Sequence, residues 1–160
     1  MRLTSGSMRM NDFYKFDRNY TEKSVLTGAC ALARAGLTTT STSHLDLQTS
    51  IKSLDGLRTL PCNFYYNSNI DYVYELSPGQ VNPLLLQPSK ERAIVENIAH
   101  LDWIDEGILI EAMQNYLLWF RNDEKLYKCA DHFNVSREAI DYWIREADRK
   151  STRLNSSHHS

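Results

Sequence analysis

The residues best placed for chemistry are two histidine–aspartate pairs, His44 with Asp46 and His100 with Asp102. Each pair offers two ligands, whereas a metal site in a protein usually needs three or four. The sequence has no glycine-rich phosphate loop, no Cys-x-x-Cys pair, no His-Glu-x-x-His motif and no Gly-x-Ser-x-Gly motif. It therefore predicts no catalytic residue, no metal site and no cofactor, and the protein is not expected to be an enzyme.

The three cysteines, Cys30, Cys62 and Cys129, lie far apart, and their number is odd. This pattern is typical of reduced thiols in a cytoplasmic protein rather than of a disulfide framework. Cys30 lies among alanines on an expected buried helix face, so its predicted role is packing rather than nucleophilic attack.

A more distinctive group of polar residues is Ser89, Glu91 and Arg92, at the start of an expected helix. Ser89 is a good N-cap, and Glu91 lies in the first turn, where the helix dipole favours a carboxylate. Glu91 and Arg92 could pair with neighbours or belong to a buried polar network. From the chemistry alone, capping combined with a salt bridge is the favoured interpretation.

Composition and charge limit the kinds of protein that this sequence can encode. The chain has 160 residues, of which 42% are apolar and 24% charged, as expected for one folded domain. No apolar stretch reaches the roughly 18–20 residues that span a bilayer, so no membrane association is expected. The N-terminus lacks the apolar core of a secretory signal.

The last residues, "DRKSTRLNSSH" at 148–158, resemble the in-frame translation of a sequencing adaptor. We therefore expect the natural sequence to stop at Ala147. Since residues 148–160 hold three of the 18 basic residues and one of the 20 acidic ones, the rest carries 15 against 19, a formal net charge of −4. A mildly acidic domain lacks the field that gathers nucleic acid.

The elements that must position these residues indicate an α+β fold. We expect a small mixed β-sheet with a packed helix, followed by a helical subdomain. An unstructured leader is predicted at 1–12. One domain follows at 13–147, and it is β-rich over 13–88 and helical over 89–147. The tail at 148–160 is predicted to be disordered or to extend the last helix. In the first part the sequence predicts a helix at 24–37, a half-buried strand at 44–50, a hairpin of strands at 62–68 and 71–76, and a buried strand at 82–88.

Four helices are expected in the second part, because apolar residues recur there at helical spacing. Their predicted N-caps are Ser89, Asp105, Asp123 and Ser136.

The last two helices form a helix-turn-helix-like pair at 126–146. Ala130 allows a close crossing, and Asn134 suits the positive φ of the turn. Arg137, Tyr142 and Arg145 are the candidate nucleic-acid contacts. The exposed face of the second helix also carries three carboxylates, Glu138, Asp141 and Glu146. We therefore favour a structural role for the pair, with DNA binding as the alternative.

Aromatic residues crowd the segment "NFYYNSNIDYVYEL" at 63–76. Without interleaved lysines or arginines, this pattern favours core packing and a protein-contacting face over base stacking. Tyr65, Tyr72 and Tyr74 are the predicted members of that face.

Two stretches together resemble the AbiEi-type antitoxins of type IV toxin–antitoxin systems. "VLTGACALARAGL" at 25–37 is similar to the small-residue helix of that family, and "LLLQPSKERAIVE" at 84–96 is similar to its strand-to-helix junction. The junction motif is matched by Ser89, Glu91 and Arg92. The resemblance implies a bacterial, cytoplasmic domain that opposes a nucleotidyltransferase-type toxin in a two-gene abortive-infection system.

The chain departs from the family pattern in one respect. The family's N-terminal winged helix, which binds promoter DNA, has no counterpart before the first similar segment. The expected partner is therefore a cognate toxin protein. DNA is a candidate second partner, bound either by that missing domain or by the C-terminal helix pair. Two alternatives stay open: a DNA-binding transcriptional regulator, and a mobile-element enzyme whose active site lies beyond the sequence.

Overall fold

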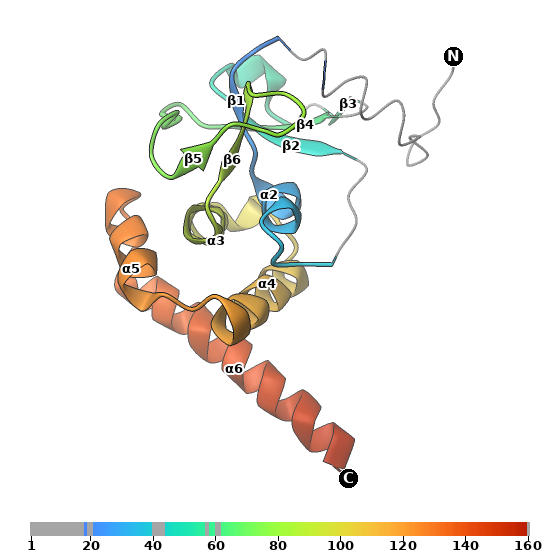
Figure 1. Cartoon of the computed structure of the whole chain (residues 1–160), viewed down its shortest axis with the longest axis vertical. Coiled ribbons are helices and arrows are strands. Elements are labelled where there is room, and N and C mark those ends of the chain that lie inside the picture. Colours follow the sequence, from blue (N-terminus) through green and yellow to red (C-terminus); the bar gives the residue numbers. More distant parts are fainter. Residues whose placement is uncertain (1–17, 19–20, 40–43, 57, 60–61, 160) are drawn as a thin grey trace, which may run out of the picture.

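The computed structural model describes residues 18, 21–39, 44–56, 58–59 and 62–159, with side chains left undescribed at 58–59 and 152–159. Strands gather at one end of the molecule and α6 extends away from them at the other, while α2, α3, α4 and α5 lie between, with α5 beside α3 (Figure 1). This is the expected α+β fold with a helical C-terminal part. Among the described residues, no helix is long and apolar enough to cross a membrane.

The first of two small sheets has the strand order β1-β6-β5. Its strands are β1 (Ser24–Val25), β5 (Leu76–Ser77) and β6 (Leu85–Pro88). β6 is parallel to β1 and antiparallel to β5. β6 confirms the strand predicted at 82–88.

The second sheet has the order β2-β4-β3. Its strands are β2 (Leu45–Thr49), β3 (Arg58–Thr59) and β4 (Cys62–Tyr66). β2 is parallel to β4, and β3 is antiparallel to it. A short 3₁₀ helix, η1 (Lys52–Leu54), follows β2, and a single bridge between Leu26 and Leu47 connects the two sheets. β2 confirms the predicted strand, but all five of its residues are buried rather than every second one.

The predicted hairpin of 62–68 with 71–76 is wrong. β4 and β5 belong to different sheets, and the intervening residues form turns. The backbone N–H groups of Val73 and Tyr74 both bind the Asp71 carboxylate at 2.8 Å. Since these two N–H groups bind Asp71, they cannot donate hydrogen bonds to a neighbouring strand.

The helix predicted at 24–37 is shorter than expected, because Ser24 and Val25 form β1 and α2 spans Gly28–Arg34. Asp46 explains the start of α2: its carboxylate accepts a hydrogen bond from the Cys30 N–H at 3.2 Å. Gly28 has a φ of +59°, and a Cβ there would lie 3.1 Å from the Asp46 carboxylate. Glycine is therefore required at this junction.

The C-terminal part contains α3 (Lys90–Ala99), η2 (Leu101–Trp103), α4 (Glu106–Trp119), α5 (Asp123–His132) and α6 (Arg137–His159). Three predicted caps are confirmed: Ser89, Asp105 and Ser136 accept hydrogen bonds from the N–H groups of Arg92, Gly107 and Ala139. The fourth is wrong, since Asn122 rather than Asp123 caps α5 by accepting from the Lys125 N–H.

One hydrophobic core runs through both parts. It joins Leu47 of β2 and Leu85 of β6 to Ile94 of α3, Met113 of α4 and Ile140 of α6. The sheets and the helices therefore form a single packed unit, and residues from either part can build one site.

Candidate functional site

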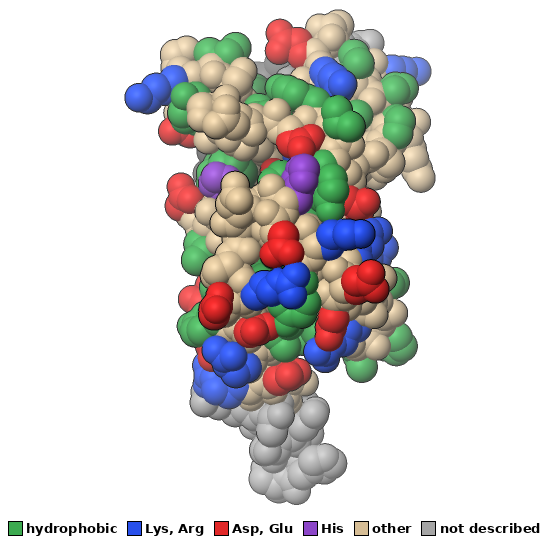
Figure 2. All heavy atoms as spheres, turned by 90° about the vertical axis from the view of Figure 1, so that its left-hand side faces the viewer, with side chains coloured by type: hydrophobic (Ala, Val, Ile, Leu, Met, Phe, Trp, Pro, Cys, Tyr) green, Lys and Arg blue, Asp and Glu red, His purple; other side chains and the backbone are tan. Residues whose placement is uncertain are grey.

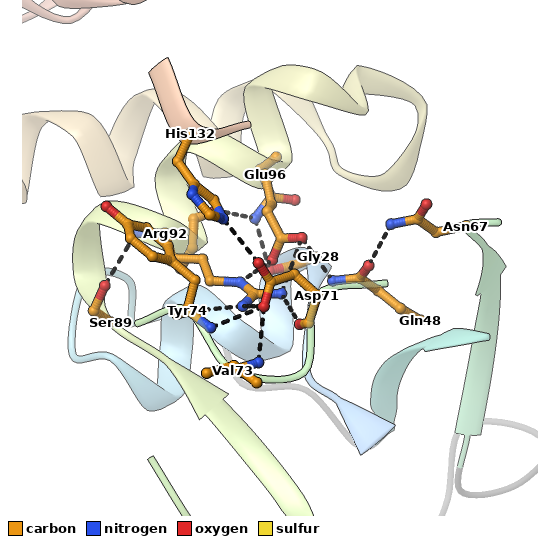
Figure 3. A network of polar contacts seen from close by, with 12 residues as sticks. Gly28, Gln48, Asn67, Asp71, Val73, Tyr74, Ser89, Arg92, Glu96 and His132 are labelled. Carbon is orange, nitrogen blue, oxygen red and sulfur yellow. Dashed lines mark hydrogen bonds and ion pairs between the residues drawn. The ribbon is translucent and has the colours of Figure 1, made fainter. Parts of the chain in front are cut away.

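Arg92 lies at the centre of a buried polar network in the first turn of α3. Its side chain is fully buried, although arginine is almost never buried without partners. Nε donates to Glu96 Oε1 at 2.8 Å, Nη1 to the Tyr74 carbonyl at 2.6 Å, and Nη2 to the Asp71 carbonyl at 2.7 Å (Figure 3). The guanidinium thus fixes the loop before β5 to α3.

Glu96 extends the network toward the second sheet. Its Oε2 accepts a hydrogen bond from the Gln48 amide at 3.0 Å, and Gln48 Oε1 accepts one from the Asn67 amide at 2.9 Å. Gln48 lies on β2 and Asn67 directly follows β4, so the chain of contacts shown in Figure 3 reaches from α3 across both strands. These contacts satisfy Glu96 inside the fold, where an unpaired carboxylate would be costly.

Asp71 connects the same loop to the helix pair. Its Oδ2 lies 2.8 Å from His132 Nε2, at the C-terminal end of α5. Burial alone would raise the pKa of Asp71, but hydrogen bonds from the Tyr74 N–H, His132 and the Val73 N–H, together with the charge of Arg92, lower it to about 2. Asp71 is therefore ionised at neutral pH.

Aromatic stacking reinforces this contact. The His132 ring lies flat on the Tyr74 ring with centroids 3.7 Å apart. Phe133 meets both rings edge-on, and the Arg92 guanidinium lies 4.9 Å from its centroid. The loop at 71–75, α3 and the end of α5 are therefore held together by charge, hydrogen bonds and ring contacts.

Glu91, the neighbour of Arg92 on α3, contacts a different set of residues. It accepts a hydrogen bond at 2.8 Å from the Tyr116 hydroxyl of α4 and lies 3.6 Å from the Lys125 ammonium of α5. Burial and the bond to Glu91 raise the pKa of Tyr116. Lys125 also pairs with Glu75 at 3.1 Å. Both charged motif residues, Glu91 and Arg92, thus belong to buried networks. These networks contain more contacts than the capping and the salt bridge that the sequence predicted.

A pocket of about 280 Å³ opens beside the Arg92 network. We call it the polar pocket. Its lining comes from the loop after β4, the C-terminal end of α3 and the α5–α6 turn: Asn67, Asn69, Asp71, Glu96, Ala99, His100, His132, Phe133 and Asn134. His100 stacks on Trp103 with centroids 3.7 Å apart. Burial lowers the pKa of His100, so its imidazole is neutral at pH 7.

The three tyrosines of the predicted protein-contact face do not lie on one strand. Tyr65 is on β4 and packs against Trp103, whereas Tyr72 and Tyr74 lie in the turn-forming segment before β5. All three are partly buried, and Tyr74 belongs to the Arg92 network.

The predicted nucleic-acid contacts all lie on α6. Arg137 is paired with Asp131 at 2.8 Å, and its guanidinium lies over the Tyr127 ring. Arg145 and Tyr142 are exposed. On the face that includes α5, lysines and arginines alternate with carboxylates rather than gathering into a stripe (Figure 2). The turn itself matches the prediction, since Asn134 has a φ of +57°.

The other chemical candidates are dispersed or buried. Cys30, Cys62 and Cys129 are buried and form no disulfide with one another, which agrees with the predicted reduced thiols. Burial raises the pKa of both Cys62 and Cys129 to about 12, so these thiols stay protonated. Within the described part of the chain, no group of three or more histidine, cysteine and acidic residues is arranged to hold a metal ion.

Two apolar surfaces lie outside the network. At the end of α4, three consecutive residues, which we call the apolar patch, are exposed: Leu118 at 69%, Trp119 at 70% and Phe120 at 44%. Elsewhere an apolar groove of about 470 Å³ lies between η2, α4 and α6. Tyr142 and Trp143 form part of its wall.

Sequence reasoning missed Asp71, Glu96 and His132 as members of the site. The Arg92–Glu96 spacing is i, i+4 on a helix, so that pair carried a detectable signal. Asp71 and His132 carried none, because only the tertiary fold brings them together. No protein-family model matches the chain, and no curated protein matches it in sequence.

Proposed function

We propose that the chain is an antitoxin-like, protein-binding domain that opposes a nucleotidyltransferase-type toxin in a bacterial two-gene abortive-infection system. It acts by contact and without catalysis of its own. The proposal joins the resemblance around Ser89, Glu91 and Arg92 to one structural observation, the apolar patch.

The apolar patch carries the protein-binding part of the proposal. Large contiguous apolar surface is uncommon on monomeric proteins and marks sites of interaction, and tryptophan is enriched among residues that dominate binding energy. Trp119 and Leu118 are both more than two-thirds exposed. Lys90 lies 4.5 Å from the Phe120 ring centroid, which places a cation at the edge of the patch. A complementary partner therefore presents an apolar surface edged by a carboxylate.

The motif residues support the proposal in a different way. Arg92 and Glu91 direct their charged groups into the domain, toward Glu96, Tyr116 and backbone carbonyls. Because Glu91 and Arg92 are paired inside the domain, they do not contact a partner. Their role in the proposal is to hold rigid the domain that carries the apolar patch.

The test begins with the locus from which the sequence comes. We expect a nucleotidyltransferase reading frame next to it, whose product arrests growth when expressed alone and is neutralised by this chain. The purified proteins should bind each other. Trp119→Ala should weaken that binding at least tenfold, whereas Val73→Ala, which alters an 82% exposed residue outside the patch, should not. A neighbouring gene of another class, or binding that tolerates Trp119→Ala, would contradict the proposal.

The second candidate function is DNA binding by the α5–α6 pair. It is favoured by the positive φ of Asn134 and by the hydrogen bond from the Val135 N–H to the Ala130 carbonyl, which together form a tight turn between the helices. Binding of duplex DNA that falls steeply with salt and is lost in Arg145→Ala would favour this alternative.

A further inference from the structure

We propose that the polar pocket binds a nucleobase, presented as a nucleoside or as an unpaired base of a nucleic acid. The residues that recognise the base are Asn69 and Asn134, with His100, His132 and Phe133 providing ring surfaces. This inference goes beyond the proposed toxin contact and rests on different residues.

The rings suit a flat ligand. His132 and Phe133 come from the end of α5, and His100 comes from the C-terminal cap of α3, so aromatic groups line the pocket from two elements. His100 and His132 are each held by stacking on another ring, Trp103 and Tyr74 respectively. Rings fixed in this way offer a base a surface on which to stack, whichever base it is.

Two uncharged side-chain amides in the pocket still have open hydrogen-bonding groups. Among the described contacts, the side-chain amides of Asn69 and Asn134 bind no other protein group, and His132 uses only Nε2, toward Asp71. The neutral His100 imidazole offers one donor and one acceptor. The two amides and the His100 imidazole, which both donate and accept, match the edge of a nucleobase, which does the same.

The floor of the pocket is rigid. Asp71 and Glu96 line it, and both are fixed by hydrogen bonds from Arg92, to the Asp71 carbonyl and to the Glu96 carboxylate. Their side-chain oxygens already accept hydrogen bonds from Val73, Tyr74, Arg92 and Gln48. The amides and rings are therefore presented on a preformed frame, which lowers the entropy lost on binding.

Size and charge specify the ligand further. A volume of about 280 Å³ is just below the range of roughly 300–1,000 Å³ that holds drug-sized ligands, and it suits a nucleoside. Among the residues that the structure describes, the lining contains two carboxylates and no lysine or arginine. Recognition therefore concerns the base, and a phosphate should add no affinity.

The experiment titrates the full chain with each of four ribonucleosides, with adenosine monophosphate and with a short single-stranded oligoribonucleotide. Binding is followed by calorimetry and by the aromatic NMR signals of Phe133 and His132. Asn69→Ala removes one amide from an exposed loop position, and Asn134→Gly removes the other while tolerating the positive φ. Ser68→Ala is the matched control, since Ser68 is an exposed neighbour outside the lining.

We expect at least one nucleoside to shift both ring signals. Asn69→Ala and Asn134→Gly should each weaken its binding by about 3- to 10-fold, the loss of one hydrogen bond, while Ser68→Ala leaves it unchanged. The monophosphate should bind no more tightly than adenosine. An oligonucleotide that binds more tightly, with the same loss in Asn69→Ala, identifies an unpaired base of a nucleic acid as the source.

Three results would overturn the proposal. The first is the absence of any shift in the ring signals with all four nucleosides at several times millimolar concentration. The second is a monophosphate that binds at least tenfold more tightly than adenosine, since recognition would then centre on phosphate. The third is binding that neither Asn69→Ala nor Asn134→Gly weakens.

Discussion

Arg92 and Arg137 place the same side chain in two opposite environments. Arg92 is fully buried and donates to a carboxylate and to two backbone carbonyls, whereas Arg137 is 59% exposed and pairs with the equally exposed Asp131. In both regions the guanidinium also lies over an aromatic ring, Phe133 or Tyr127. The two regions therefore differ chiefly in access to water.

That difference determines what each arginine can do. Water screens the Arg137 pair, so its contribution to folding is small and the side chain can exchange partners. At Arg92 water is excluded, and removing either partner would leave the other buried and uncompensated. The buried Arg92 therefore stabilises the fold, whereas the exposed Arg137 can exchange its partner for a group on another molecule.

The largest effect is expected from Arg92→Met. Loss of the guanidinium leaves the buried Glu96 carboxylate without its ion-pair partner, so we expect the free energy of unfolding to fall by about 3–5 kcal/mol. Urea denaturation followed by circular dichroism measures this change. Adding Glu96→Leu should recover part of the loss, because it removes the uncompensated carboxylate. If Arg92→Met alone were as stable as the wild type, the buried arginine would not stabilise the fold more than the exposed one does.

A smaller loss is expected from Tyr116→Phe. The hydroxyl donates to Glu91 and accepts from the Asn122 N–H at 3.0 Å, so its removal should cost about 1–3 kcal/mol. Thermal unfolding of this variant can be compared with Tyr142→Phe, in which the altered side chain is exposed. Equal melting temperatures for the two variants would count against the Glu91 branch of the network.

Asp71 should make stability depend on pH. Its pKa in the fold is about 2, below the ordinary value of 3.8, so it stabilises the folded state above about pH 4 and the effect is lost as the pH falls through 2. Asp71→Asn should therefore be less stable than the wild type by about 1–2 kcal/mol at pH 5, and the difference should shrink toward pH 2. Urea midpoints measured between pH 5 and pH 2 test this; a constant difference would show that the carboxylate charge is not responsible.

The smallest effect is expected from Arg137→Ala, since both members of its ion pair lie in water. The urea midpoint should not change measurably. If it fell as far as in Tyr116→Phe, the contrast between the buried and the exposed arginine would no longer hold.

Local signals in the sequence predicted much of the fold. The caps at Ser89, Asp105 and Ser136 and the positive φ of Asn134 depend on neighbouring residues alone, and they are confirmed. The short apolar run between Pro83 and Pro88 also predicted the buried strand β6.

The failures arose where distant groups compete for the backbone. Residues 71–75 have the composition of a strand, but Arg92 takes the carbonyls of Asp71 and Tyr74, and Asp71 takes two N–H groups. In the same way Ser24 and Val25 lie in a helical pattern yet pair with β6. The candidate site was largely hidden for this reason, since its contacts join residues far apart in the chain.

The parallel pairing of Ser24 with Leu85 has a consequence for synthesis on the ribosome. β1 emerges long before β6, and at roughly 5–20 residues per second the delay is on the order of 3–12 s. Until then the neighbouring Leu26, which is fully buried in the finished fold, has no completed core to enter. During this interval the nascent chain therefore exposes apolar surface of the kind that chaperones bind.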